Sequence, residues 1–175
     1  LDCSNTRFWL FHSMNSSTSV DWLVQRLIGL SQNLDAAWIP AQLLEKASQY
    51  GAFRGLNLDY DRRHIPDVDF GAPGAPVEFL KMQLWGNKAG EVLRILRQED
   101  SFPHETTLSK VKVKFWLAQQ RNGEFSIDDI KYNGKITARG TSFQSHITLV
   151  SDIYRRYAEL IRHIEARFSI GYNVK

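Results

Sequence analysis

The last part of the chain carries an apolar pattern that constrains the whole fold. Apolar residues recur at three- and four-residue spacing from about Ser142 to Arg167. This period is typical of an amphipathic helix, whose apolar stripe has to be buried against another layer. The sequence therefore predicts a long C-terminal helix that covers a sheet. The stripe comprises Phe143, Ile147, Val150, Ile153, Tyr154, Tyr157, Leu160, Ile161, Ile164 and Phe168.

Two patterns before this helix predict the strands that it covers. Residues 110–117 begin with alternating lysine and apolar side chains, the period of a strand with one wet, basic face. Residues 125–139 then read as a hairpin. A three-residue loop with Gly134 in the left-handed conformation pairs Ile130 with Ile136, whereas a two-residue turn would pair apolar with polar side chains. We therefore expect the longer, bulged turn.

The rest of the chain alternates between strands and helices. Strands are predicted at residues 6–12, 53–60 and 77–85, and helices at residues 20–29, 38–50 and 89–98. The fold class is therefore α+β, with a mixed sheet and a C-terminal antiparallel meander covered by the long amphipathic helix. A length of 175 residues allows one sizeable core, so we expect a single compact domain over residues 1–175. Residues 61–76 hold three of the five prolines and two glycines, which predicts a Pro/Gly-rich loop.

Composition and motifs narrow the class of function. No apolar run approaches the roughly 20 residues of a membrane-spanning helix, so we expect no membrane association. The one cysteine, Cys3, forms neither an internal disulfide nor by itself a zinc site, and it favours an intracellular, cytoplasmic location. The sequence has no Gly-x-Ser-x-Gly elbow, no His-Glu-x-x-His motif and no P-loop. We therefore expect a non-enzymatic protein that needs neither a cofactor nor a metal.

Positive charge is concentrated in the second half of the chain. Residues 1–87 carry seven Lys and Arg against nine Asp and Glu, and residues 88–175 carry fifteen against ten. Lysines of neighbouring strands share one surface if the register allows, with Tyr132 and Trp116 nearby for stacking. Such a surface binds polyanions, although lysine on a sheet also discourages edge pairing. The candidates for this basic face are Lys110, Lys112, Lys114, Lys131 and Lys135, with Arg139 beside them.

The junction between the hairpin and the last helix is a second candidate site. A helix that starts at Thr141 or Ser142 has N–H groups without helical partners at the positive end of its dipole, which suits phosphate or carboxylate. The same residues also have a purely structural interpretation, in which Gly140 makes a tight turn and Ser142 caps the helix. The predicted anion-binding residues are Arg139, Gly140, Thr141, Ser142, Ser145 and His146.

An acidic cluster at the end of the strand 53–60 is a third candidate. Two carboxylates on one side of a strand end can hold a magnesium ion for phosphoryl chemistry. Arg62 and Arg63 lie among these residues and favour a salt-bridged surface loop instead. The candidate catalytic residues of this alternative are Asp59, Asp61, His64 and Asp67.

These patterns leave three functions open. The leading hypothesis is a non-enzymatic anion-binding or regulatory module that contacts nucleic acid or a phosphorylated ligand. The first alternative is a metal-dependent phosphoesterase or nuclease that uses the acidic cluster. The second alternative is a protein-interaction domain of a larger assembly or homo-oligomer, because five tryptophans and ten phenylalanines exceed what one core needs.

Overall fold

A computed structural model describes residues 1–3, 5, 7–61, 78–99, 102, 106–117 and 123–168. The chain divides into two compact units. One unit comprises Leu1–Ala37 together with Tyr154–Lys175, and the other comprises Trp38–Ile153. The predicted Pro/Gly-rich loop lies almost entirely outside the described residues.

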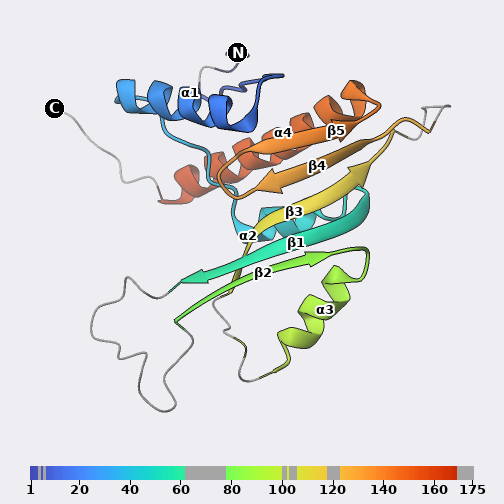
Figure 1. Cartoon of the computed structure of the whole chain (residues 1–175). Helices are drawn as coiled ribbons and strands as arrows, with labels where there is room; N and C mark the ends of the chain where they lie inside the picture. Colours follow the sequence, from blue (N-terminus) through green and yellow to red (C-terminus); the bar gives the residue numbers. More distant parts are fainter. Residues whose placement is uncertain are drawn as a thin grey trace. The chain divides into compact units, whose positions relative to one another are not determined.

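The second unit is built on a five-stranded sheet with the order β2-β1-β3-β4-β5 (Figure 1). Each strand pairs with its neighbours in antiparallel orientation. The strands are β1 (Ala52–Asp61), β2 (Phe79–Trp85), β3 (Thr107–Phe115), β4 (Ser126–Lys131) and β5 (Ile136–Gly140). The helices of this unit are α2 (Ala41–Ala47), α3 (Ala89–Leu96) and the first part of α4 (Phe143–Phe168).

The α+β class, the C-terminal meander and the long helix are therefore confirmed. The sheet was predicted to be mixed, and this part of the prediction is wrong, because every described pairing of its strands is antiparallel. In the part of the chain that is described, the predicted strand at residues 6–12 adds no strand to this sheet. Among the described residues of that segment, only Leu10 makes a β-bridge, and its partner is Asp2 rather than a sheet strand.

One side of the sheet forms the core of this unit, and we call it the core face. The period of two places apolar residues of the three central strands on this side. Figure 1 shows α2 and the start of α4 on the same side of the sheet. The buried residues of these elements are Leu56, Leu58, Val111, Val113 and Ile130 from the strands, Leu43, Leu44 and Ala47 from α2, and Leu149, Val150 and Ile153 from α4.

The β4–β5 hairpin has the register that its sequence predicts. Ile130 pairs with Ile136, the Lys131 N–H donates to the Lys135 carbonyl at 3.0 Å, and Gly134 has φ of 76°. A left-handed residue is needed there because the bulged turn reverses the chain within three residues. The bulged turn is therefore confirmed.

The first unit contains α1 (Ser17–Leu30) and the second half of α4. The N-cap of α1 is Ser16, whose hydroxyl accepts the Ser19 N–H, so the helix begins before the predicted residue 20. Phe8 makes edge-to-face contacts with Tyr154 and Tyr157 of α4. In the described part of the chain, no helix is long and apolar enough to span a membrane.

Candidate functional site

The strand register brings the predicted basic residues to one side of the sheet. Lys110 pairs with Lys131, and Lys112 pairs with Asp129, so these side chains share a face. Lys114 lies on the same face because side chains alternate along β3. This side is opposite to the core face, which takes Val111 and Val113 from the same strand.

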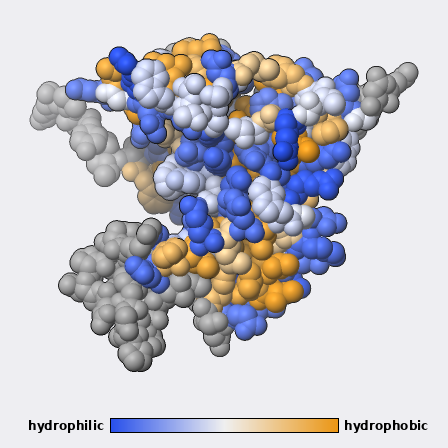
Figure 2. All heavy atoms as spheres, viewed as in Figure 1, coloured by the Kyte–Doolittle hydropathy of each residue, from blue (hydrophilic) through white to orange (hydrophobic). Residues whose placement is uncertain are grey.

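The hairpin adds two more cations to this side. Lys135 lies opposite Lys131 across the turn, and Arg139 pairs with Ile127, which in turn pairs with Lys114. We call this side of the sheet the basic face. Six cations of this face were predicted from the sequence, namely Lys110, Lys112, Lys114, Lys131, Lys135 and Arg139, and Lys81 of β2 lies on the same side. Figure 2 shows hydrophilic residues gathered over β3 and β4, and hydrophobic ones around α3.

The centre of the basic face is partly buried. The side chains of Lys110 and Lys112 are 13% and 11% exposed, and both approach Asp129. The Lys112 ammonium lies 3.2 Å from Asp129 Oδ1, and the Lys110 ammonium lies 4.0 Å from Asp129 Oδ2. The contact of Lys112 with Oδ1 is an ion pair that does not have the geometry of a hydrogen bond. Two ammonium groups therefore share one carboxylate.

Trp85 of β2 is the residue of this face that the sequence reasoning missed. Its ring centroid lies 3.6 Å from the Lys112 ammonium and 5.0 Å from that of Lys110, and both distances are cation–π contacts. Trp85 pairs with Gly55 of β1, which pairs with Lys112 of β3. Because Gly55 has no side chain, the indole can reach across β1. A glycine inside a strand pattern was the available signal, since it often marks such a close approach.

The outer part of the basic face is more accessible. Arg139 is exposed, while Lys114 and Lys131 are half-buried. The Lys114 ammonium lies 3.9 Å from the centroid of the Phe125 ring. In the part of the chain that the structure describes, these three cations form no ion pair with an acidic side chain, so they are the cations best placed to meet an external anion.

The two aromatic residues expected near the lysines have different surroundings. Tyr132 makes an edge contact with Trp38 at 4.8 Å between ring centroids, and its N–H donates to the Ser109 carbonyl at 3.0 Å. Trp116 directly follows β3 and is 50% exposed. Among the described residues, neither ring makes a cation–π contact with the lysines of the basic face.

The predicted anion-binding corner forms a hydrogen-bonded joint between the hairpin and α4. The N–H groups of Thr141 and Ser142 both donate to the Phe125 carbonyl, at 2.9 and 3.1 Å. The Thr141 hydroxyl accepts the Phe125 N–H at 3.2 Å, and the Ser142 hydroxyl accepts the Ser145 N–H at 3.2 Å. These three N–H groups at the start of α4 are therefore bonded within the protein. Arg139 is the exposed cation of this corner, and anion binding at the corner stays a prediction.

A second polar joint near this corner consists of Ser126, Asp128 and His146. Of these three residues, the sequence predicted only His146 as part of a site. His146 Nδ1 lies 2.5 Å from Oδ1 of Asp128, which is fully buried on β4. The Ser126 hydroxyl donates to the other oxygen of Asp128 at 2.6 Å. His146 was predicted to meet an external anion, and its Nδ1 instead meets a carboxylate of this chain. A buried carboxylate needs such partners because burial without them is costly.

The acidic cluster is only partly described. Asp59 and Asp61 lie on one side of β1, and the Lys81 ammonium is 4.0 Å from Asp59 Oδ1. His64 and Asp67 lie outside the described residues. Within the described part of the chain, no three His, Cys, Asp or Glu side chains are grouped to hold a metal ion. The metal-dependent alternative therefore stays a prediction.

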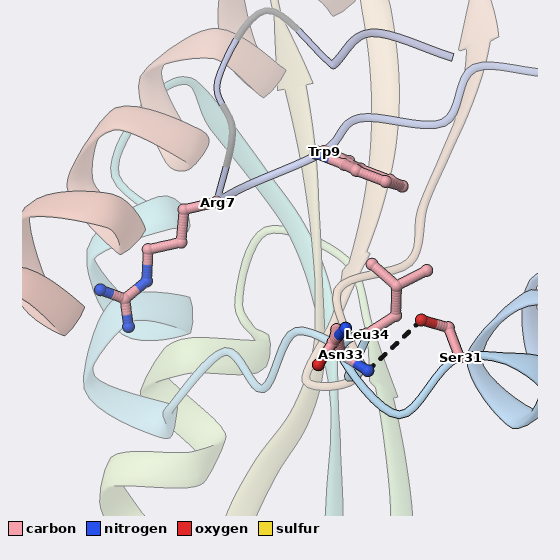
Figure 3. Close-up of a pocket in the computed structure, with 5 residues that line it drawn as sticks. All are labelled: Arg7, Trp9, Ser31, Asn33 and Leu34. Atoms are coloured by element: carbon pink, nitrogen blue, oxygen red, sulfur yellow. Dashed lines mark hydrogen bonds between the residues drawn. The ribbon is translucent and has the colours of Figure 1, made fainter. Parts of the chain in front are cut away.

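One hollow of about 550 Å³ lies within the first unit (Figure 3). Its lining residues are Arg7, Trp9, Ser31, Asn33 and Leu34. Arg7 turns away from the other four residues and forms an ion pair with Glu165. Among the described residues, Arg7 is the one charged residue that lines this hollow, and its charge is paired with Glu165, so the lining offers a ligand no unpaired charge.

Comparison with known proteins places the chain in a family. The family model for MJECL33-like proteins matches residues 1–175. The chain belongs to the MJECL33-like family. An archaeal relative, the uncharacterized protein MJECL33 of Methanocaldococcus jannaschii, is 25% identical over 198 aligned residues. The alignment covers 94% of this chain and 48% of the relative, so the chain spans about half the length of that family member. No solved structure matches the chain.

Proposed function

We propose that the basic face binds a polyanion, and that its ligand is nucleic acid. The single observation that carries this proposal is the register of β3, β4 and β5, which gathers six cations on one side of the sheet. Acidic residues on the same side are fewer, namely Asp59, Asp61 and Asp129. An excess of cations on one surface attracts a chain of phosphates and steers its approach.

The arrangement also favours a repeating ligand over a single phosphate. Successive cations of β3 are two residues apart, or about 6.7 Å along the strand, and neighbouring strands lie about 4.8 Å apart. The positive charge is therefore spread over a surface rather than focused at one point. A cytoplasmic location, where nucleic acid is abundant, is part of this proposal and fits the free Cys3.

Charge variants test the proposal directly. We expect the double variant Lys114→Gln/Arg139→Gln to weaken the binding of a labelled oligonucleotide and to flatten its salt dependence. Two lost phosphate contacts should reduce the slope of log K against log salt by about 1.4 for a single strand. Fluorescence anisotropy at several salt concentrations measures both quantities.

The matched control removes two charges from other elements. Lys46 of α2 and Arg94 of α3 are exposed and lie outside the basic face. The variant Lys46→Gln/Arg94→Gln should therefore bind like the unmodified chain. Equal losses in the two double variants, or an affinity that does not depend on salt, would remove the basic face as the binding surface.

A specific observation also favours the protein-interaction alternative. Five tryptophans occur in the sequence, and each is between 46% and 66% exposed, namely Trp9, Trp22, Trp38, Trp85 and Trp116. Exposed aromatic rings are enriched in protein interfaces. Under this alternative, the mass measured by light scattering should rise with protein concentration and be insensitive to salt. A constant monomer mass would count against self-association through these rings.

A further inference from the structure

We propose that Trp85 is a stacking platform for an unpaired nucleobase, so that the ligand of the basic face is single-stranded nucleic acid. This inference rests on the proposed function and adds the class of nucleic acid and the residue that selects it. It starts from the position of the indole at one end of a row that crosses three strands. The row consists of Trp85, Gly55 and Lys112.

The indole contacts two cations and is still accessible. Lys112 and Lys110 place their ammonium groups 3.6 and 5.0 Å from its centroid. The side chains of these lysines are largely buried, but Trp85 itself is 52% exposed. Because about half of the Trp85 surface stays in water beside these contacts, the indole has room to stack with a flat group.

The surroundings of Trp85 on this face are polar. The next residues on the same side of β2 are Gln83 and Lys81. On β1, Gly55 beside Trp85 has no side chain, and the nearest side chain on this face is that of Asn57. The apolar residues Leu84 and Met82 point to the core face by alternation, so they cannot cover the indole. An exposed indole amid polar groups gains from stacking with a base, because a base has an apolar π face and a polar edge.

The cations near Trp85 supply the contacts that the phosphates of such a base need. Within the described part of the chain, Asp129 is the one acidic partner of Lys112 and Lys110. A phosphate beside the stacked base would therefore add the second anion that two neighbouring ammonium groups favour. Stacking and phosphate contact together are the means by which sheet proteins hold single strands.

Duplex nucleic acid cannot use this platform. Its bases are stacked on each other inside the helix, so only phosphates and groove edges meet a flat sheet. The basic face can still attract a duplex through its phosphates. Trp85 should therefore distinguish single strands from duplexes, while the cations should not.

The test compares three probes: a twelve-nucleotide single strand, the duplex of the same sequence, and inorganic polyphosphate. We expect Trp85→Ala to weaken single-strand binding by roughly 5- to 150-fold, the range of one lost base stack. Binding of polyphosphate and duplex should change by less than about twofold. Trp85→Phe should retain most of the single-strand affinity, because a phenyl ring also stacks. Trp22→Ala, at a 59% exposed position in α1, is the matched control and should have no effect.

The outcomes separate this inference from the proposed function. Equal losses on the single strand and on polyphosphate would mean that Trp85 only positions the lysines, which overturns the platform. An unchanged single-strand affinity in Trp85→Ala would overturn it as well, while salt-dependent polyphosphate binding would leave the polyanion function intact. Failure of all three probes to bind the unmodified chain would overturn both. Unfolding curves of each variant show whether a loss comes from misfolding.

Discussion

Gly140 at the end of β5 offers the sharpest test of the joint between the hairpin and α4. Its φ is 149°, and a Cβ built on it would lie 2.3 Å from the Phe125 carbonyl oxygen and 2.9 Å from the Ser126 Cα. Both neighbours are backbone atoms, so they cannot move aside as a flexible side chain can. The Phe125 carbonyl also accepts the N–H groups of Thr141 and Ser142. Gly140→Ala therefore strains the backbone and pushes apart the strand that anchors α4.

The magnitude follows from two terms. A side chain in this region of φ costs about 1–3 kcal/mol. Forcing one more carbon into a packed site costs about 1–3 kcal/mol in addition. We therefore expect Gly140→Ala to lower the free energy of unfolding by about 2–6 kcal/mol, and the Tm by roughly 4–24 °C for a chain of this length.

Urea unfolding followed by far-UV circular dichroism measures the loss, and Gly90→Ala is the matched control. Gly90 lies in α3, and a Cβ there meets only Phe53 Cε1, at an ordinary 3.8 Å. The same substitution should therefore be neutral or stabilise the protein by up to about 1 kcal/mol, because alanine favours a helix. A Gly140→Ala variant within about 0.5 kcal/mol of the unmodified chain would refute the reasoning about the joint.

Three further predictions concern other parts of the second unit. His146→Ala leaves the buried Asp128 carboxylate without its nitrogen partner and should lower the free energy of unfolding in urea by about 3–5 kcal/mol. A smaller loss of stability in Asp128→Asn would show that the unpaired charge is the cause. Gly55→Ala places a Cβ 3.1 Å from the Trp85 ring and should shift the tryptophan emission; an unchanged spectrum would contradict the packing across β1. If the acidic cluster holds magnesium, Asp59→Asn should abolish any magnesium- or manganese-dependent cleavage, and full activity in this variant would exclude the assigned site.

The elements that the sequence predicted well are those with a clear local period. The long helix was predicted over residues 142–167 and is found at Phe143–Phe168. The strand at 110–117 is found at Thr107–Phe115, and the hairpin strands agree within two residues. Each of these segments repeats its pattern often enough for one period to dominate.

The elements predicted less well depend on distant partners. Residues 6–12 have the composition of a buried strand, and the described part of that segment makes only one bridge. The helix expected over residues 38–50 is shorter, at Ala41–Ala47. Apolar composition shows that a segment favours burial, but the neighbour that buries it is fixed only by the tertiary fold.

The candidate sites show the same division. The sequence identified the cations of the basic face, because alternation alone places Lys110, Lys112 and Lys114 on one side of a strand. It could not assign Trp85 to that side, because the contact with Lys112 passes through Gly55 on a third strand. It also could not show which N–H groups at the start of α4 are bonded within the protein, since only the fold brings the Phe125 carbonyl to those of Thr141 and Ser142.

The sequence by itself determined the C-terminal helix, the alternation of β3 and the register of the β4–β5 hairpin. These features depend on side-chain period and on one left-handed glycine, and both act over a few residues. The tertiary structure alone decided which strands are neighbours, and with them the row from Trp85 to Lys112 and the joint around the Asp128 carboxylate. Pairing between distant strands depends on how the whole core is buried, and no short stretch of sequence contains that information.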